Sequence, residues 1–265
     1  MKIPKFGNLT NPSIDILREI RTIKRMGFDF VEIGIEGPEG KPEKLLKKKK
    51  GILKLLRKYK MFVIGHTSWW AELGSNYEPV RKAWVEHGKR CIRVSSELGI
   101  SLLNFHSHSR GMYNKEKAKK QILNNSIKSL KELIKYGKKY NIKIMLENAA
   151  ENGEITDLKD FKHIIDRVPG LKVHLDVGHA FLFGGMKNIE NFIKVFKNKL
   201  VHIHVSDNHG ESDEHLPIGK GSINYSRVVK LLKKIKYDKT ITFEIFTKNR
   251  NSAKYSMKKF KKLWK

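Results

Sequence analysis

The amino-acid sequence predicts a single (β/α)8 TIM barrel, and three observations lead to this fold class. The chain has 265 residues, a length typical of one such barrel. Short apolar and β-branched runs alternate with longer amphipathic segments along the whole chain. Ionisable residues follow one apolar run after another, at the position where the strands of a barrel end and its functional loops begin.

The short apolar runs are the predicted strands. Parallel strands buried on both faces read as nearly continuous apolar segments, as Met61-Phe62-Val63-Ile64 does. The first of the eight runs is the weakest. The predicted strands cover residues 2–6, 30–35, 61–64, 102–105, 142–146, 171–175, 200–205 and 240–244.

The longer amphipathic segments between these runs are the predicted helices. They cover residues 14–26, 43–59, 77–98, 115–140, 158–168, 189–196, 225–235 and 252–264. Eight strand–helix units give about 33 residues per unit, the size expected of a βαβ repeat. No linker or shift in composition divides the chain, so residues 1–265 are predicted to form one domain. An open doubly wound sheet is the alternative, but its Gly-rich nucleotide-binding turn is absent after the first strand.

The composition excludes several classes of protein. Hydrophobic residues make up 39% of the chain, and no apolar run approaches a membrane span, so neither a disordered nor a membrane protein is expected. The N-terminal segment lacks the features of a signal peptide, which predicts a cytoplasmic location. The single cysteine, Cys91, excludes an internal disulfide and a thiolate-rich zinc site. Any metal must therefore be bound by His, Asp and Glu.

The charge of the chain is strongly positive, with 55 Lys and Arg residues against 27 Asp and Glu residues, formally +28. One interpretation is attraction to phosphates of nucleic acid or of phosphorylated metabolites. The other is a compositional bias towards lysine on solvated outer helices, since runs such as residues 47–50, 115–120 and 258–265 lie in predicted helices. The second interpretation is slightly favoured.

Ionisable side chains recur where the predicted strands end. A single histidine or glutamate at such a place is usually structural. Here five histidines and four carboxylates are expected on one rim, a costly arrangement unless cations neutralise it. Nitrogen and oxygen ligands, with several imidazoles, indicate Zn²⁺ or Mn²⁺.

These residues lie in segments that resemble the xylose isomerase-like TIM-barrel superfamily, which contains sugar isomerases and epimerases as well as endonuclease IV. The resemblance covers nearly the whole chain, and residues 102–106, 146–148, 174–179 and 204–221 carry it most specifically. It implies one to three divalent metal ions. In endonuclease IV nine ligands hold three zinc ions, and a residue of the right type stands at each of the nine matching positions. By that resemblance the ligands would be His66, His106, Glu147, Asp176, His179, His204, Asp213, His215 and Glu244. By that resemblance Glu147 would bridge two ions, and Asp213 and His215 would hold the third.

A sugar or sugar-phosphate isomerase or epimerase is the favoured function. The resemblance then implies one metal on Glu147, Asp176, His204 and Glu244, which stabilises an enediolate while the two glutamates exchange substrate protons. Trp69 and Trp70 could offer apolar faces to a sugar. Lys220 and Arg110, in predicted rim loops, could hold a phosphate, although each alone reads more simply as surface charge.

The alternative is an endonuclease IV-like enzyme that hydrolyses DNA at abasic sites. The complete nine-residue set and the charge of +28 favour it. The acidic segment 32–40, taken as a loop, opposes it, because acidic groups repel a phosphate backbone. Asp176-Val177-Gly178-His179 also departs from the nuclease's Asp-Thr-Cys-His signature. Against the epimerase, an arginine that some of these enzymes carry would fall at Gly210. A non-catalytic barrel that binds nucleic acid is a third possibility, opposed by the intact ligand set.

Three further histidines lie beside these ligands in the sequence. His174 and His202 alternate with Asp176 and His204 along their strands, so they should share the inward face. They could hydrogen bond to the ligands or be simple polar residues of the barrel interior, and the first interpretation is favoured. His108 is an alternative to His106 as the ligand after the fourth strand. The sequence does not identify the substrate, the number of ions or the oligomeric state.

Overall fold

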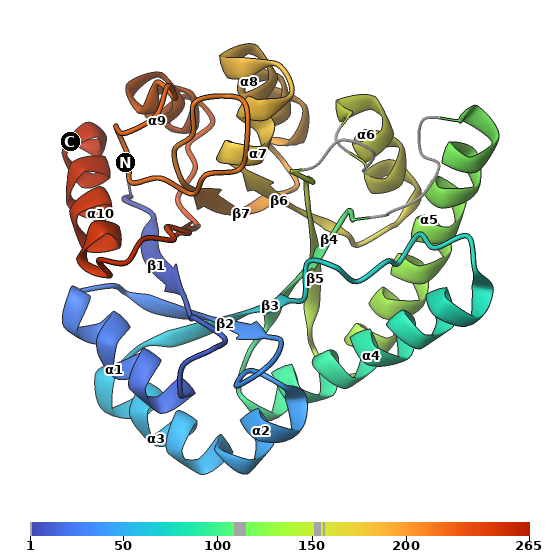
Figure 1. The fold of residues 1–265 in the computed structure, drawn as a ribbon, viewed down its shortest axis with the longest axis horizontal. Coiled ribbons are helices and arrows are strands. Elements are labelled where there is room, and N and C mark those ends of the chain that lie inside the picture. The colour runs from blue at the N-terminus through green and yellow to red at the C-terminus, as the bar shows by residue number, and fades with distance from the viewer. Residues whose placement is uncertain (1, 109–114, 151–154, 156) are drawn as a thin grey trace.

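The computed structural model describes residues 2–108, 115–150, 155 and 157–265. Eight parallel strands form a closed barrel in sequence order, from β1 to β8 (Figure 1). Lys5 of β1 aligns with Thr240 of β8, which closes the ring. The predicted single (β/α)8 TIM barrel is therefore confirmed. The strands are β1 Lys5–Leu9, β2 Phe30–Ile35, β3 Phe62–Thr67, β4 Leu102–His106, β5 Lys143–Glu147, β6 Lys172–Asp176, β7 Leu200–Val205 and β8 Thr240–Phe243.

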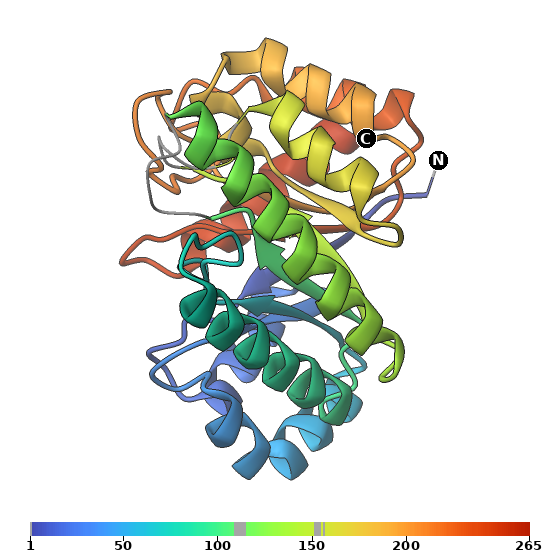
Figure 2. The ribbon, with the colours of Figure 1, turned by 90° about the vertical axis from the view of Figure 1, so that its right-hand side faces the viewer.

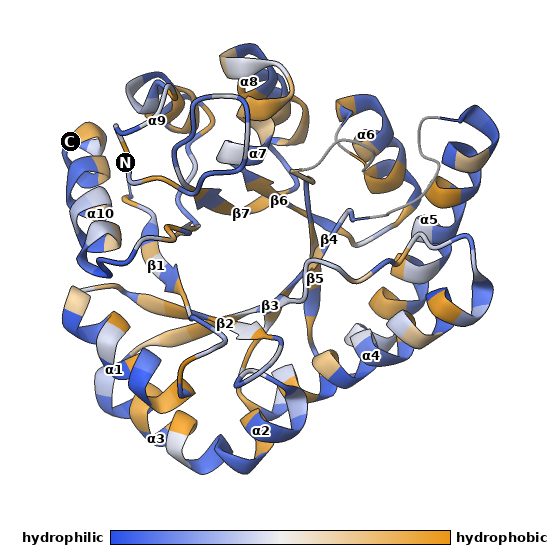
Figure 3. Ribbon diagram, viewed as in Figure 1, coloured by the Kyte–Doolittle hydropathy of each residue, from blue (hydrophilic) through white to orange (hydrophobic). Residues whose placement is uncertain are grey.

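Helices surround the ring of strands, and the two chain ends lie near each other in both views (Figures 1 and 2). In Figure 3 most helices carry hydrophilic and hydrophobic residues, as expected of helices that pack one face on a barrel. The lysine-rich stretches of α2, α3, α5 and α10 lie on this outer layer. The helices are α1 Ile16–Met26, α2 Pro42–Lys47, α3 Lys49–Tyr59, α4 Glu78–Glu97, α5 Glu116–Lys138, α6 Leu158–Arg167, α7 Val177–Leu182, α8 Gly185–Phe196, α9 Tyr225–Lys234 and α10 Asn251–Trp264.

The barrel interior changes character along the strands. Phe30, Ile64 and Met145 form a buried apolar cluster inside the ring. Side chains of a strand alternate between its two faces, so the residues two positions further along point inward as well. Those residues are Glu32, His66 and Glu147. An apolar layer is thus followed by a layer of ionisable groups towards the carboxyl ends of the strands.

The first strand lies three residues later than predicted, at Lys5–Leu9 instead of residues 2–6. Ile3 is 50% exposed, so the apolar residues at the N-terminus do not all enter the barrel. Gly7 sits in β1 because the Phe30 ring occupies the space that a side chain at residue 7 would need. The strand is positioned by this contact with β2, which a search for apolar runs does not detect.

The predicted helix 43–59 is divided into α2 and α3 at Lys48, whose φ of −94° and ψ of 2° leave the helical range. The Lys48 ammonium lies 2.8 Å from Asp15, the N-cap of α1, and 2.9 Å from Glu39. The side chain at the break therefore connects α2 and α3 to the start of α1. Within the described ranges, none of the helices combines the length and the apolar character needed to cross a membrane.

Candidate metal centre and substrate cavity

The nine residues predicted as ligands gather at one end of the barrel. Because the strands are parallel, their carboxyl ends lie on the same rim. His66, His106, Glu147, Asp176 and His204 are the last or next-to-last residues of β3 to β7, and Glu244 follows β8 directly. His179 lies on α7, a short helix that was not among those predicted from the sequence. Asp213 and His215 lie in the loop between β7 and α9.

The nine residues form three groups, in each of which one ligand atom of every member lies within 4.8 Å of the others. Glu147 belongs to two of these groups, and no predicted ligand falls outside them. The first group is His66, His106 and Glu147; the central group is Glu147, Asp176, His204 and Glu244; the third group is His179, Asp213 and His215.

In the first group two imidazole nitrogens point at each other. The Nε2 atoms of His66 and His106 are 3.2 Å apart, and the Oε2 atom of Glu147 lies 3.4 Å and 3.0 Å from them. Burial opposes a charge on either ring, but contact with Glu147 raises the pKa of His66 above its ordinary value. A divalent cation would accept both nitrogen lone pairs and the carboxylate at once.

The central group places three carboxylates and one imidazole around a single point. The Nδ1 atom of His204 lies 2.9 Å from Glu244, 3.8 Å from Glu147 and 3.9 Å from Asp176. Burial and the charges of Glu244 and Glu147 raise the pKa of Asp176 to about 6. The Oδ2 atom of Asp176 is buried and has no hydrogen-bond partner among the described residues. These features fit a divalent cation, which would relieve the repulsion and coordinate the free oxygen.

In the third group Asp213 lies between two histidines. Its Oδ2 atom is 3.2 Å from Nε2 of His179 and 2.9 Å from Nε2 of His215. The other ring nitrogens contact backbone carbonyls: Nδ1 of His179 is 2.9 Å from the Asn148 oxygen, and Nδ1 of His215 is 3.1 Å from the Glu244 oxygen. Such contacts place the proton on Nδ1 and leave Nε2 free to bind a metal. The donor set of this group therefore also fits Zn²⁺ or Mn²⁺.

The loop that carries Asp213 and His215 is held by Asp207, which is fully buried at the end of β7. The Asp207 carboxylate accepts hydrogen bonds from the backbone amides of Asn208, Gly219 and Ile223. His215 has a φ of 47°, a conformation that costs energy for a residue with a side chain. Hydrogen bonds to Asp207 therefore hold the loop in place, and the loop keeps His215 of the third group in a strained backbone conformation.

A cavity of about 680 Å³ opens over the three groups. Seven of the nine residues line it, whereas Asp176 and His204 lie below its surface. Trp69 and Trp70 also line it, 42% and 40% exposed, with ring centroids 5.6 Å apart at a nearly perpendicular angle. His108, the alternative to His106, lies on the cavity wall with its ring centroid 5.4 Å from that of Trp69 and belongs to none of the three groups.

The basic residues of the cavity differ from those predicted. Lys220 is exposed and is not among the residues that line the cavity, so the structure does not support a substrate contact from it. Arg110 lies outside the described residues. Arg250 lines the cavity instead, 2.5 Å from Glu19 through its guanidinium. Arg250 lies in an irregular segment after β8, and no pattern in the sequence there predicts that its side chain would reach the cavity.

The segment 32–40 is not the acidic loop expected from the sequence. Glu32 lies within β2 and is fully buried, next to His202 and His204. Glu39 is paired with lysines of α2 and the helix break. Glu36 alone among the three faces the cavity, and burial raises its pKa. The electrostatic argument against DNA is therefore weaker than predicted, because it depends on one carboxyl group.

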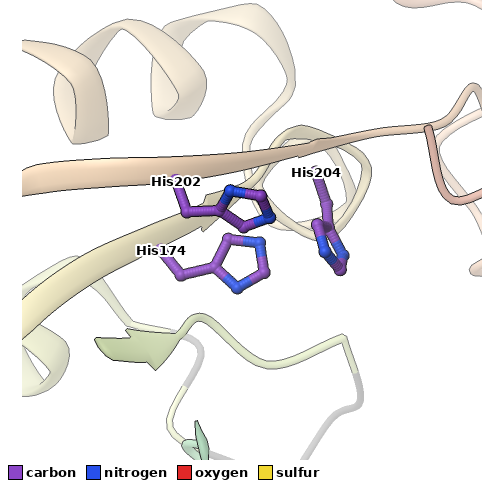
Figure 4. Close-up of side chains that lie close together, drawn as sticks. All are labelled: His174, His202 and His204. Atoms are coloured by element: carbon purple, nitrogen blue, oxygen red, sulfur yellow. The ribbon is translucent and has the colours of Figure 1, made fainter. Parts of the chain in front are cut away.

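His174 and His202 are fully buried inside the barrel, as their alternation with Asp176 and His204 predicted. The two rings lie next to each other and to that of His204 (Figure 4). The Nδ1 atom of His174 is 3.0 Å from Asn104 and 3.3 Å from Glu147. His202 contacts Glu32 rather than a predicted ligand. The ligands of the central group thus rest on a second layer of buried polar side chains.

Comparison with known proteins places this geometry among related barrels. An uncharacterized protein of Methanocaldococcus jannaschii is 38% identical over 173 residues, which are 65% of this chain and 66% of that protein, just under two thirds of its length. A probable endonuclease 4 of Aquifex aeolicus is 27% identical over 93% of each chain. The crystal structure of a D-tagatose 3-epimerase-like protein superposes with a TM-score of 0.86, at 28% identity, over 98% of this chain and 96% of that one.

The profile of one family matches most of the barrel, from residue 20 to residue 263. The matched segment contains all three groups of ionisable residues. Its relatives include both an epimerase-like protein and a probable endonuclease, the two kinds of enzyme implied by the sequence resemblance. This chain belongs to the xylose isomerase-like TIM barrel family.

Proposed function

We propose that this protein is a divalent-metal-dependent isomerase or epimerase that acts on a sugar or a sugar phosphate. The observation that carries the proposal is the division of the central group. Glu147 and Glu244 line the cavity, whereas Asp176 and His204 lie below its surface, each with no exposed area. Two carboxylates are therefore within reach of a substrate, and two residues serve only as ligands.

The arrangement suits a proton transfer between neighbouring carbon atoms. A divalent cation bound by the central group would polarise a substrate carbonyl and the adjacent hydroxyl. The Asn104 amide donates a hydrogen bond of 2.5 Å to Glu147, and Glu244 lies 2.9 Å from Nδ1 of His204, so both carboxylates have fixed positions beside the cation site. One glutamate removes a proton from carbon and the other returns a proton, in the manner of positioned general bases and acids. Trp69 and Trp70 supply the apolar wall that a sugar needs.

The epimerase proposal is tested by solvent exchange. Purified protein, loaded with Mn²⁺ or Zn²⁺, is incubated in D₂O with a panel of ketoses and their phosphates. We expect deuterium at the carbon next to the carbonyl of at least one substrate, with loss of exchange in Glu244→Gln. Glu39→Gln, which removes a charge outside the cavity, is the matched control and should exchange normally. Absence of exchange with every sugar in metal-loaded protein contradicts the proposal.

A specific observation favours a second function, the hydrolysis of DNA at abasic sites. The third group of His179, Asp213 and His215 is more than a one-metal isomerase requires. Together the three groups would hold three ions, which suits the activation of water and stabilisation of a leaving oxygen. The relative from Aquifex aeolicus, a probable endonuclease 4, matches over 93% of this chain.

An incision assay separates the two functions. A duplex with one abasic site is incubated with the protein at several salt concentrations, with and without chelator. Chelator-sensitive cutting with about three ions bound supports the nuclease, and the charge of +28 then serves DNA binding. No cutting, with solvent exchange on a sugar, supports the epimerase.

A further inference from the structure

A buried carboxylate in the barrel interior is not used by either proposed reaction. Glu32 points inward from β2, has no exposed surface and does not line the cavity. Its Oε2 atom lies 2.9 Å from Nε2 of His204 and 3.1 Å from Nε2 of His202. A charged group in such a place is costly unless hydrogen bonds compensate it. Oε2 of Glu32 has these two contacts, whereas Oε1 has no hydrogen-bond partner among the described residues.

The number of contacts determines which atoms carry protons. Both histidines approach the same carboxylate oxygen, and a protonated Glu32 could donate to only one of them. An ionised Glu32 is purely an acceptor, and both Nε2 atoms then donate to its oxygen; two ring nitrogens converging on one carboxylate oxygen fit this state. The Thr240 hydroxyl lies 2.7 Å from Nδ1 of His202 and 3.3 Å from the Val201 carbonyl, and in this assignment its one proton goes to the nearer acceptor, the ring nitrogen. This assignment satisfies both nitrogens of His202 with one neutral tautomer.

The same assignment leaves Nδ1 of His204 facing the central group. That atom lies 2.9 Å from Glu244 and within 4 Å of Glu147 and Asp176. A proton on Nδ1 would prevent coordination, whereas a proton on Nε2 permits it. The partner of Nε2 therefore decides whether His204 can act as a ligand.

The three histidines in Figure 4 lie close enough to suggest an additional ion, but their contacts favour the hydrogen-bonded network. Both nitrogens of His202 and of His204 already have partners among the described residues. On His174 only Nε2 has none. An ion at this point would have to displace the contacts of Glu32 with both neighbouring rings.

We propose that Glu32 is a positioning residue: its carboxylate holds a proton on Nε2 of His204 and thereby presents Nδ1, with its lone pair, to the divalent cation of the central group. The inference rests on the proposed metal centre, but it does not depend on whether that centre serves a sugar or DNA. Loss of such a carboxylate partner typically lowers metal affinity about 10–100-fold.

The test measures zinc affinity and the protonation of His204. Glu32→Leu keeps the approximate volume and removes both acceptors, so one zinc ion should bind about 10–100-fold more weakly in a titration against a competing chelator. The third group contains neither Glu32 nor His204, so at least one ion should keep its wild-type affinity. Glu32→Gln retains an acceptor oxygen and should restore most of the lost affinity. Asp160→Asn, which neutralises a buried carboxylate of α6 that is paired with Lys119 of α5, is the control and should change nothing.

Nitrogen-15 NMR of the histidine rings tests the same inference in the wild-type protein. We expect Nε2 of His204 to carry a proton in the metal-free and in the zinc-loaded state. An unprotonated Nε2 in either state overturns the inference, as does unchanged zinc affinity in a folded Glu32→Leu variant. Zinc on Nε2 of His174, His202 and His204 also overturns it. If the wild type binds no zinc, the metal centre is wrong, and the metal-free spectrum alone decides the role of Glu32.

Discussion

Replacing Glu147 with glutamine should remove metal from two groups and spare the third. Glu147 contributes to the first group through Oε2, which lies 3.0 Å from Nε2 of His106. It contributes to the central group through Oε1, which lies 3.8 Å from Nδ1 of His204. The third group does not include it. The substitution keeps the size of the side chain and removes the charge that both groups use.

The size of the expected loss in zinc affinity follows from the number of ligands that each group loses. The first group falls from three protein ligands to two, and the central group from four to three. Loss of a residue that merely supports a ligand costs about 10–100-fold in affinity, so loss of a shared ligand should cost at least about 100-fold at each site. A tenfold change corresponds to about 1.4 kcal/mol, which makes the loss about 2.8 kcal/mol or more per ion.

The assay is equilibrium dialysis against buffered zinc, followed by measurement of zinc per chain. The wild type should retain up to three ions, and Glu147→Gln should retain one at the same free zinc concentration. Glu39→Gln, which removes a half-buried charge paired with lysines outside the cavity, is the control for net charge. Retention of all ions with unchanged affinity refutes the role of Glu147, and loss of every ion refutes the independence of the third group.

Three further results are expected. Burial opposes a charge on His215, but contact with Glu244 and Asp213 outweighs it and raises the pKa of His215 to about 9. The stabilisation from this group is complete below pH 6.5 and is lost as the pH rises through 9. Urea unfolding of metal-free protein in chelator should therefore show the free energy of unfolding fall by up to about 3 kcal/mol over this range. Trp70→Ala should raise KM for a sugar about tenfold through lost apolar contact, and unchanged KM at unchanged zinc content would remove Trp70 from the substrate site. Gly221→Ala should destabilise the protein by about 1–3 kcal/mol in thermal unfolding, because the added carbon overlaps the backbone of the β7–α9 loop; a stability equal to wild type would show that the loop adjusts freely.

Much of the barrel could be predicted from the sequence because buried parallel strands read as apolar runs. β2 and β7 have the predicted bounds for this reason. β1 does not, because its place depends on Gly7 making room for Phe30, a contact between residues far apart in the chain. The helix break at Lys48 likewise depends on ion pairs with α1 and its neighbouring loop. Local pattern determines the type of element, and contacts between elements determine where it begins and ends.

The site shows the same limit. Ionisable residues at strand ends could be predicted as one cluster, because parallel strands bring their carboxyl ends together. Glu32 could have been found as well: it lies in the predicted strand 30–35 and shares the inward face of Phe30. Its assignment to a loop was wrong. Arg250 had no such signal, since an irregular segment has no periodicity that predicts where a side chain points.

The division of the ligands between strands and a loop has an evolutionary consequence. Predicted ligands that lie on strands, such as Glu147 and His204, cannot move without disturbing the barrel. Asp213 and His215 instead depend on a surface segment that is held by Asp207. Surface segments accept insertions and deletions that a closed sheet does not. A lineage of such barrels can therefore gain or lose one ion by altering this segment alone. The count of ions, and with it the class of reaction, can diverge while the scaffold stays the same.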